Sequence, residues 1–344
     1  FTSGTTGNPK GVILTHKNLY TNVINSVKHH NSDERTTTIG VLPLAHLYGL
    51  QMANTCYVTG SSIVIFSKFE PERIFEAIEK YKVKSFAAVP AMIHALYHFP
   101  DSDKYDLSSL ETVGSGSAPL PVALIYGFQK KFNVQILEGY GLTETAPAVA
   151  THVRGKPIKP GSVGIPLPGV EIKIVDDDGN EVPVGEAGEL LVRGENVTPG
   201  YFRNEEETRK AIKNGWFHTG DIAKLDEDGY LFIVDRKKDI IIRGGFNLYP
   251  RDVEEIIAKH PGVMEVAVVG VPDEKMGEEM IACVVKKPGM EVAEEDIIGL
   301  CQEHLTKRKT PKRVLFIEQL PRNSVGKILK RHLRTIAEDM LAKQ

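Results

Sequence analysis

The feature that most restricts the fold is a regular alternation of short apolar runs and longer segments with helical spacing between residues 36 and 139. Short apolar runs bounded by turns are typical of buried strands, and apolar residues repeating every three to four positions are typical of helices. The strand-like runs cover 38–42, 62–66, 85–89, 112–114 and 134–137, and the helical segments cover 72–81, 91–99 and 121–132. Strands alternating with helices form a mostly parallel sheet covered by helices. We also expect a short strand over 11–14 and a helix over 17–30, all within a βα-layered subdomain at 1–160.

The pattern changes between residues 161 and 234, where turn-forming residues multiply and helical spacing nearly vanishes. The turn-rich segment DDDGN separates strand-like runs at 170–175 and 188–192, which predicts an antiparallel β subdomain. The remaining segment, 240–344, is long enough to fold alone and predicts a small α+β domain. Its expected helices cover 250–259, 293–304 and 328–341, and its expected strands cover 263–271, 280–285 and 314–317.

A compact charged run, DRKKD at 235–239, follows a strand-like run at 231–234. It is either a linker between domains or a solvated turn, and the sequence alone does not separate the two. We predict an α/β and α+β protein. A large N-terminal domain over 1–234 combines the βα-layered sheet with the β subdomain, and a small α+β domain over 240–344 follows the linker.

Composition excludes several classes of protein. The 344 residues are 41% hydrophobic and 25% charged, as in ordinary globular proteins, and a net charge of −3 gives no reason to expect nucleic acid as a partner. The three cysteines show no CxxC spacing, and no apolar run approaches the roughly 18 residues of a membrane span. We therefore expect a cytoplasmic protein with free thiols, in which the glycosylation sequon at Asn196 is a chance match.

The chain opens with FTSGTTGNPKG, a run that combines hydroxyls, glycines and Lys10. Unhindered backbone N–H groups, hydroxyls and one ammonium together suit a polyphosphate, whereas a flexible linker would not use β-branched threonines closed by Pro-Lys. It is not a Walker A loop, because no Gly-Lys pair is followed by Ser or Thr at the required spacing. A loop of this kind normally follows a strand, so we expect an N-terminal portion to precede residue 1.

Three further motifs follow apolar runs. EGYGLTET places Tyr140, Thr143 and Glu144 in one turn, where a ring, a hydroxyl and a carboxylate suit base stacking, phosphate contact and Mg²⁺ ligation. GSGSAP at 114–119 is a small-residue turn that admits close approach of a planar base, although such turns are common. PLAHLYG contains His46, which on its own reads equally as a core or surface histidine.

The opening run and the ordered motifs behind it resemble the acyl-adenylate-forming (AMP-binding) enzymes, which include acyl-CoA synthetases, adenylation domains of peptide synthetases and luciferases. The likeness covers nearly the whole chain. The long run NGWFHTGDIAKLDEDGYLFIVDRKK is similar to that of long-chain fatty-acid–CoA ligases. The resemblance implies that the C-terminal domain is mobile and pivots at the DRKKD run.

The resemblance also implies roles for single residues. Lys327 would bridge the substrate carboxylate and the α-phosphate, Glu144 would bind Mg²⁺, Thr143 would contact phosphate, and His46 would lie near the substrate carboxyl. Leu50 stands where some long-chain members carry an aromatic gate, which puts that gate in doubt. The nucleotide and CoA would be bound by Thr2, Ser3, Gly4, Thr5, Thr6, Gly7, Lys10, Gly116, Ser117, Ala118, Pro119, Gly139, Tyr140, Gly141, Asp221, Arg236, Gly244 and Gly245.

The implied reaction has two steps. A fatty acid attacks the α-phosphorus of ATP to give acyl-AMP and pyrophosphate, with Mg²⁺ bound, and the thiol of coenzyme A then displaces AMP. The alternatives are a ligase for aryl or other carboxylic acids such as succinylbenzoate, a luciferase-type member, an enzyme that loads a carrier-protein thiol, and a non-catalytic nucleotide-binding fragment. A homodimer and attachment to a membrane surface are left open.

Overall fold

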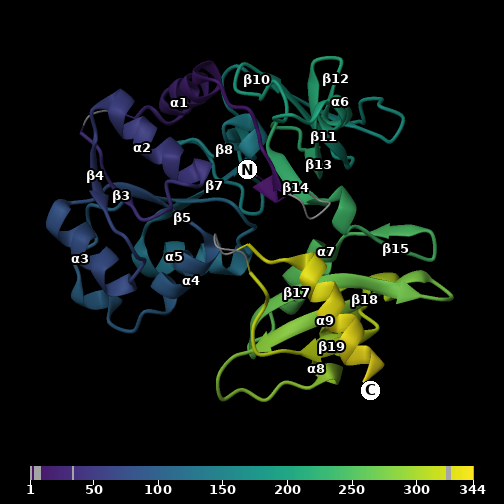
Figure 1. Ribbon diagram of the computed structural model, residues 1–344. Helices are drawn as coiled ribbons and strands as arrows, with labels where there is room; N and C mark the ends of the chain where they lie inside the picture. The colour runs from purple at the N-terminus through teal and green to yellow at the C-terminus, as the bar shows by residue number, and fades with distance from the viewer. Residues whose placement is uncertain (1, 4–8, 33–34, 323–326, 344) are drawn as a thin grey trace. The chain divides into compact units, whose positions relative to one another are not determined.

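The computed structural model describes residues 2–3, 9–32, 35–322 and 327–343 (Figure 1). The chain divides into two compact units. The first contains Phe1–Thr219 and Ala223–Ile233, and the second contains Gly220–Ile222 and Val234–Gln344. Among the described residues, no helix has both the length and the apolar character needed to cross a membrane.

A seven-stranded sheet is the larger part of the first unit. Its order is β4-β3-β5-β6-β7-β8-β9, with the first five strands parallel and β8 and β9 antiparallel. In Figure 1, α1 and α2 lie on one side of this sheet and α3, α4 and α5 on the other. The strands are β3 (Thr37–Gly40), β4 (Ser62–Ile65), β5 (Ser85–Ala88), β6 (Thr112–Ser115), β7 (Gln135–Gly141), β8 (Ala148–Thr151) and β9 (Ile165–Pro166). The helices are α1 (His16–His30), α2 (Leu47–Thr59), α3 (Pro71–Tyr81), α4 (Pro90–His98) and α5 (Val122–Phe132).

The core of this layer lies between the sheet and helices α3 to α5. Phe86 of β5 and Phe128 of α5 are buried there together with Ile74, Ile78 and Ile93. These positions follow the helical spacing seen in the sequence, because the apolar stripe of each helix is the face that covers the strands. Parallel strands joined through helices bring the carboxyl ends of β3, β5, β6 and β7 to one edge, where ligands bind in open α/β sheets.

The second sheet of the chain is antiparallel, with the order β10-β11-β13-β12 and with β14 paired to β13. β10 and β11 form the hairpin expected around the DDDGN turn, in register from Val170↔Gly194 to Val175↔Glu189. Its elements are β10 (Val170–Val175), β11 (Gly188–Gly194), α6 (Glu205–Ala211), β12 (Ile212–Lys213), β13 (Trp216–Leu225) and β14 (Leu231–Arg236). The charged run continues from β14 into the short 3-10 helix Lys237–Asp239.

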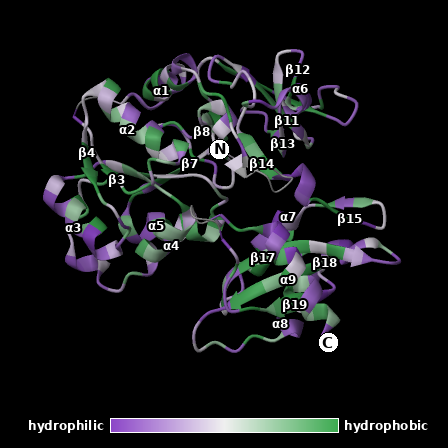
Figure 2. Cartoon of the chain, in the orientation of Figure 1, coloured by the Kyte–Doolittle hydropathy of each residue, from purple (hydrophilic) through white to green (hydrophobic). Residues whose placement is uncertain are grey.

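The second unit is built on one sheet with the order β16-β15-β18-β17, and β19 runs parallel to β18. The long strands β17 and β18 are apolar along most of their length (Figure 2). Alternate residues point to opposite faces, so Val268 packs with α7 and α8, whereas Ala267 and Val269 pack with α9. The elements are β15 (Ile241–Arg243), β16 (Phe246–Leu248), α7 (Pro250–Ile257), β17 (Val263–Asp273), β18 (Gly277–Lys286), α8 (Glu294–His304), β19 (Arg313–Phe316) and α9 (Lys330–Ala342).

The expected fold class is confirmed: a βα-layered sheet, an antiparallel β sheet and a small α+β C-terminal part follow one another. The strand expected over 11–14 is wrong. Only an isolated bridge between Val12 and Tyr201 forms there, because the backbone of this segment is paired over two residues with a distant loop rather than with a sheet. The sequence analysis also missed the β15–β16 hairpin, whose strands of three residues are too short to show alternation.

Candidate functional site

Glu144 lies in a tight turn just past the carboxyl end of β7. It belongs to the 3-10 helix Thr143–Thr145, and the residue is only 9% exposed. The Tyr201 hydroxyl donates a hydrogen bond to Glu144 Oε1 at 3.0 Å, and the Thr198 N–H donates to the Glu144 carbonyl at 2.8 Å. The carboxylate is therefore held by a tyrosine from a loop 57 residues away in sequence.

Two fully buried asparagines support the backbone of the same turn. Asn196 Nδ2 donates to the Thr145 carbonyl at 2.8 Å, and Asn22 Nδ2 donates to the Ala148 carbonyl at 2.7 Å. Asn22 Oδ1 accepts from the Ala148 N–H at 3.2 Å and from Gln51 Nε2 at 3.0 Å, so one side chain joins α1, α2 and the turn. Asn196 is 0% exposed and its Nδ2 donates inside the protein, so the side chain is not presented as a glycosylation site.

The opening loop is described only at its ends. β1 (Thr2–Ser3) and β2 (Pro9–Lys10) pair antiparallel, with Thr2 opposite Lys10. Four of the predicted phosphate-binding residues lie outside the described residues, namely Gly4, Thr5, Thr6 and Gly7. The Lys10 ammonium pairs with Glu207 of α6 and lies 5.2 Å from the centre of the Tyr201 ring. Tyr201 therefore contacts both Lys10 and Glu144.

The small-residue segment at 114–119 begins with the last two residues of β6 and continues into the turn after it. A Cβ added to Gly116 would lie 3.0 Å from Cε1 of the Tyr48 ring, so the close approach of that ring already explains the glycine. Ser117 has φ of 72°, Ser117 and Ala118 are half-buried, and Pro119 is exposed. Packing against Tyr48 thus explains the glycine in this turn, in addition to the adenine contact that the resemblance implies.

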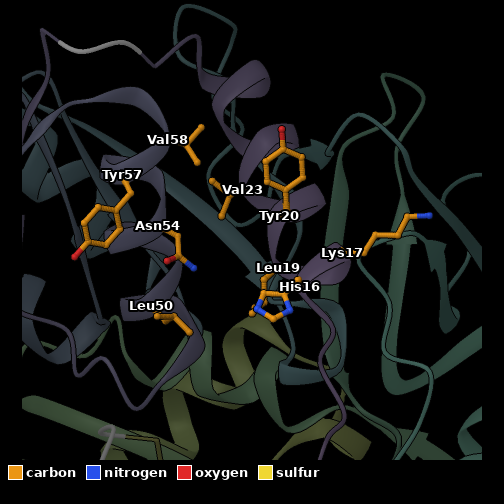
Figure 3. A pocket seen from close by; sticks show the side chains of 9 residues that line it. All are labelled: His16, Lys17, Leu19, Tyr20, Val23, Leu50, Asn54, Tyr57 and Val58. Carbon is orange, nitrogen blue, oxygen red and sulfur yellow. The ribbon is translucent and has the colours of Figure 1, made fainter.

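His46 caps the first turn of α2, because its Nδ1 accepts from the Tyr48 N–H at 3.3 Å. One turn later, Leu50 lines an apolar groove of about 680 Å³ between α1 and α2 (Figure 3). Tyr20 and Val23 come from α1, and Tyr57 and Val58 come from α2. The cap fixes the orientation of the imidazole at the start of the helix that also carries Leu50.

Opposite charges gather around Asp221 in the second unit. Asp221 is 4% exposed, and Arg236 Nε at the end of β14 lies 3.4 Å from its Oδ1. Burial, and next the charge of Arg236, lowers the pKa of Lys327 to about 8. The same two causes lower the pKa of Lys238. Three cations thus share the surroundings of two carboxylates, Asp221 and Asp239, an arrangement that an added anion would stabilise.

Gly244 and Gly245 form the two-residue turn between β15 and β16. Their φ angles of 58° and 79° match the turn type that favours glycine at both positions. A Cβ on Gly244 would lie 2.8 Å from Met276 Cε, whereas one on Gly245 would meet no atom within 4 Å. The second glycine is therefore open on its Cβ side.

A metal ion would find one suitable protein ligand near the residues that are predicted to bind phosphate. Within the described ranges there is no cluster of three or more His, Cys, Asp or Glu side chains that could hold a metal. A single carboxylate fits Mg²⁺, which is usually held by one or two carboxylates together with substrate phosphates and water. Glu144 fits that requirement, because Tyr201 already fixes its orientation through one oxygen.

The model of the AMP-binding enzyme family matches residues 1–202, and that of the AMP-binding enzyme C-terminal domain matches residues 252–327. The chain belongs to the AMP-binding enzyme family. The family resemblance seen in the sequence is therefore confirmed. Glu144, Tyr201 and both buried asparagines lie in the part matched by the first model, and Lys327 is the last residue matched by the second.

Relatives within the AMP-binding enzymes carry more than one substrate name. The long-chain-fatty-acid–CoA ligase of Salmonella typhimurium is 41% identical over 342 residues, which are 97% of this chain and 60% of that protein. The 2-succinylbenzoate–CoA ligase of Bacillus cereus is 39% identical over 341 residues, 99% of this chain and 70% of that protein. ATP-bound MatB from Rhodopseudomonas palustris superposes with a TM-score of 0.93 at 36% identity, covering 98% of this chain and 67% of that one. The chain spans about 60% of the length of the fatty-acid ligase.

Sequence reasoning missed the residues that hold Glu144. Asn22, Asn196 and Tyr201 reach the turn from positions 123, 51 and 57 residues away from their partners. Local spacing carries no signal for such contacts. The available signal was the segment NVTPGY at 196–201, a cluster of polar and turn-forming residues directly after a strand.

Proposed function

We propose that the protein activates a carboxylic acid with ATP and transfers the acyl group to coenzyme A. In the first step a carboxylate oxygen attacks the α-phosphorus, the bond to the β-phosphate oxygen breaks, and pyrophosphate leaves. In the second step the thiol sulfur attacks the acyl carbon and AMP leaves. The membership of the AMP-binding enzyme family supports this proposal, as do two relatives that are both named CoA ligases.

The observation that carries the proposal is the charged cluster around Asp221. A partly buried lysine with a pKa near 8, beside Arg236 and Lys238, is destabilised by desolvation and by like charges. The charge of an anion bound there would offset both penalties, and a phosphate joined to a carboxylate is an anion of that kind. We propose that Lys327 neutralises these groups during adenylation, and that Asp221 accepts hydrogen bonds from the ribose hydroxyls.

The remaining residues bind and orient the nucleotide in this proposal. The opening loop from Thr2 to Lys10 and the Thr143 hydroxyl hold the phosphates, and Tyr140 and the Gly116 turn hold the adenosine part. When Mg²⁺ is bound it neutralises phosphate charge, and Glu144 is the side chain that would hold it. Catalysis in this step is mainly positioning and charge neutralisation, and no residue stands out as an obligatory base.

We propose that residues 235–239 form the hinge between an AMP-binding domain over 1–234 and a C-terminal domain over 240–344. Lys327 then serves adenylation, and the turn at Gly244 and Gly245 admits the slim thiol arm of coenzyme A for thioester formation. Rotation of the smaller domain between the two half-reactions is a hinge closure of a known kind.

The proposed acid is a fatty acid. The name of the fatty-acid ligase of Salmonella typhimurium supports an aliphatic substrate. The second candidate is an aromatic acid, which is favoured by the 2-succinylbenzoate ligase of Bacillus cereus at 39% identity.

The test measures pyrophosphate release and CoA thioester formation with acids from acetate to long-chain fatty acids, together with succinylbenzoate and other aryl acids. The protein is used in its natural full length. Thioester formed with medium or long aliphatic acids supports the fatty-acid proposal, and a preference for aryl acids supports the second candidate. Pyrophosphate release without thioester on any acid would overturn the CoA ligase proposal in favour of a carrier-loading enzyme.

A further inference from the structure

The segment Asn196–Tyr201, which follows β11, has no role in the proposed reaction so far. Three of its residues converge on the turn that carries Glu144. The Asn196 amide donates to the Thr145 carbonyl, the Thr198 N–H donates to the Glu144 carbonyl, and the Tyr201 hydroxyl donates to the Glu144 carboxylate. The segment thus holds both the backbone and the side chain of this turn.

The same segment also holds the chain that leaves the opening loop. The Ile13 N–H donates to the Gly200 carbonyl at 3.0 Å, and the Phe202 N–H donates to the Gly11 carbonyl at 2.7 Å. The Thr198 hydroxyl donates to the Ile13 carbonyl, and the Tyr201 ring lies beside the ammonium of Lys10. One short stretch of chain therefore sets the spacing between the exit of the phosphate loop and Glu144.

The segment Asn196–Tyr201 is held in place by buried side chains and hydrogen bonds within the first unit. Asn196 is 0% exposed and Thr198 is 3% exposed. The Tyr201 N–H donates to the Thr208 hydroxyl of α6 at 2.9 Å, which fixes the backbone from which the phenol projects. A hydroxyl held in this way can orient a carboxylate without itself touching a ligand.

We propose that Asn196–Tyr201 is a positioning segment for a divalent cation, in which Tyr201 orients Glu144 toward the metal that accompanies the nucleotide phosphates. This inference rests on the proposed function, because it takes Glu144 as the metal ligand. Partners that orient a metal-binding carboxylate typically contribute about 10- to 100-fold to metal affinity. Tyr201 is a positioning residue, since it acts through Glu144.

The test replaces Tyr201 with phenylalanine and measures Mn²⁺ binding by electron paramagnetic resonance at saturating ATP, on the protein in its natural full length. The expected result is a dissociation constant for Mn²⁺ raised roughly tenfold. Adenylation should then need more Mg²⁺, while thioester formation from supplied acyl-AMP should be unchanged.

Tyr230→Phe is the matched control. The Tyr230 hydroxyl donates to the Pro157 carbonyl at 2.6 Å, and Lys159 Nζ lies 4.6 Å from the centre of the Tyr230 ring. The Tyr230→Phe variant therefore loses the same kind of hydrogen bond, at a position far from Glu144 in sequence. Its Mn²⁺ affinity should equal that of the parent. The proposal is overturned if Tyr201→Phe binds Mn²⁺ as the parent does, or if Tyr230→Phe weakens binding equally.

Two further variants keep the outcomes distinct. If Tyr201→Phe does not fold, Asn196→Ser is used instead, because it removes a hydrogen bond to the backbone of the same turn. Asn196→Ser should also weaken Mn²⁺ binding. An unchanged Mn²⁺ affinity in this folded variant overturns the proposal. Glu144→Gln tests the proposed function separately. If the parent binds no Mn²⁺ with ATP, or if Glu144→Gln binds it equally well, the metal assignment of Glu144 fails before the role of Tyr201 is reached.

Discussion

The Glu144 turn and the surroundings of Lys327 are held by different physical means. The Glu144 turn in the first unit rests on hydrogen bonds from neutral groups, the amides of Asn22 and Asn196 and the hydroxyl of Tyr201. The neighbourhood of Lys327 in the second unit is dominated by charges that perturb one another. Neutral hydrogen bonds fix distances and depend little on pH or salt, whereas interacting charges respond to both. The first arrangement suits a fixed scaffold and the second suits a group that must respond to its ligand.

Lys327→Ala should have the largest effect, lowering the rate of acyl-AMP formation by about 10²- to 10³-fold, as loss of one charge-stabilising donor does. Thioester formation from supplied acyl-AMP should be spared. Pyrophosphate release and thioester formation are measured separately, with Lys259→Ala at an exposed position of the same unit as the control. Equal loss in both half-reactions would contradict a role confined to adenylation.

Asn22→Ala should destabilise the first unit by about 3 kcal/mol, because it leaves the partly buried N–H and carbonyl of Ala148 without this partner. Urea unfolding monitored by circular dichroism gives the free energy of unfolding. Asn54→Ala on α2 is the control, and its effect should stay within about 0.5 kcal/mol, since alanine favours the helix. A loss as small as that of the control would show that the turn does not depend on neutral hydrogen bonds.

The pH dependence should separate the two arrangements. The Lys327 pKa is lowered to about 8, so the ammonium is present below that pH in the free enzyme and is lost as pH rises through it. The value of kcat/KM for adenylation should therefore fall about tenfold per pH unit above pH 8. The profile is recorded from pH 6 to 10, and Lys327→Ala should lack this limb. A limb that persists in the variant would assign it to another group.

Exposed charges should matter least. Arg209 and Glu205 of α6 lie 3.6 Å apart with side chains 75% and 88% exposed. Arg209→Ala should change the free energy of unfolding by no more than about 0.5 kcal/mol, because solvent and salt screen such pairs. Urea unfolding at low and high salt measures this. A larger change would mean that charge contributes to the first unit as well, and the contrast between the units would be weaker.

The fold was largely predictable because its elements are encoded locally. Helix 17–30 was expected from its apolar spacing and is α1 (His16–His30), and the β10–β11 hairpin was expected from the DDDGN turn. The strand expected at 11–14 failed because those residues pair with a loop some 190 positions away rather than with a neighbouring strand. Backbone pairing of that separation has no local signature.

The candidate site residues likewise fall into those with a local sequence signal and those without one. Glu144 and Tyr140 could be proposed from one motif, because ligand chemistry constrains neighbouring residues in a turn. Asn22 and Tyr201 could not, since both act through hydrogen bonds to partners far away in sequence and look like any polar residue in their own segments. Supports of a site are set by the packed fold, and only the structure reveals them.

The turn at Gly244 and Gly245 has a consequence for natural variation. Both residues have positive φ, yet only Gly244 faces an obstacle, the methyl group of Met276. Substitutions among orthologues should therefore differ at the two positions. Asparagine and aspartate, which tolerate a left-handed backbone, can replace Gly245. Gly244 should be retained unless a smaller residue also replaces Met276. Backbone geometry alone should therefore restrict the second glycine, whereas backbone geometry and a neighbouring side chain together should restrict the first.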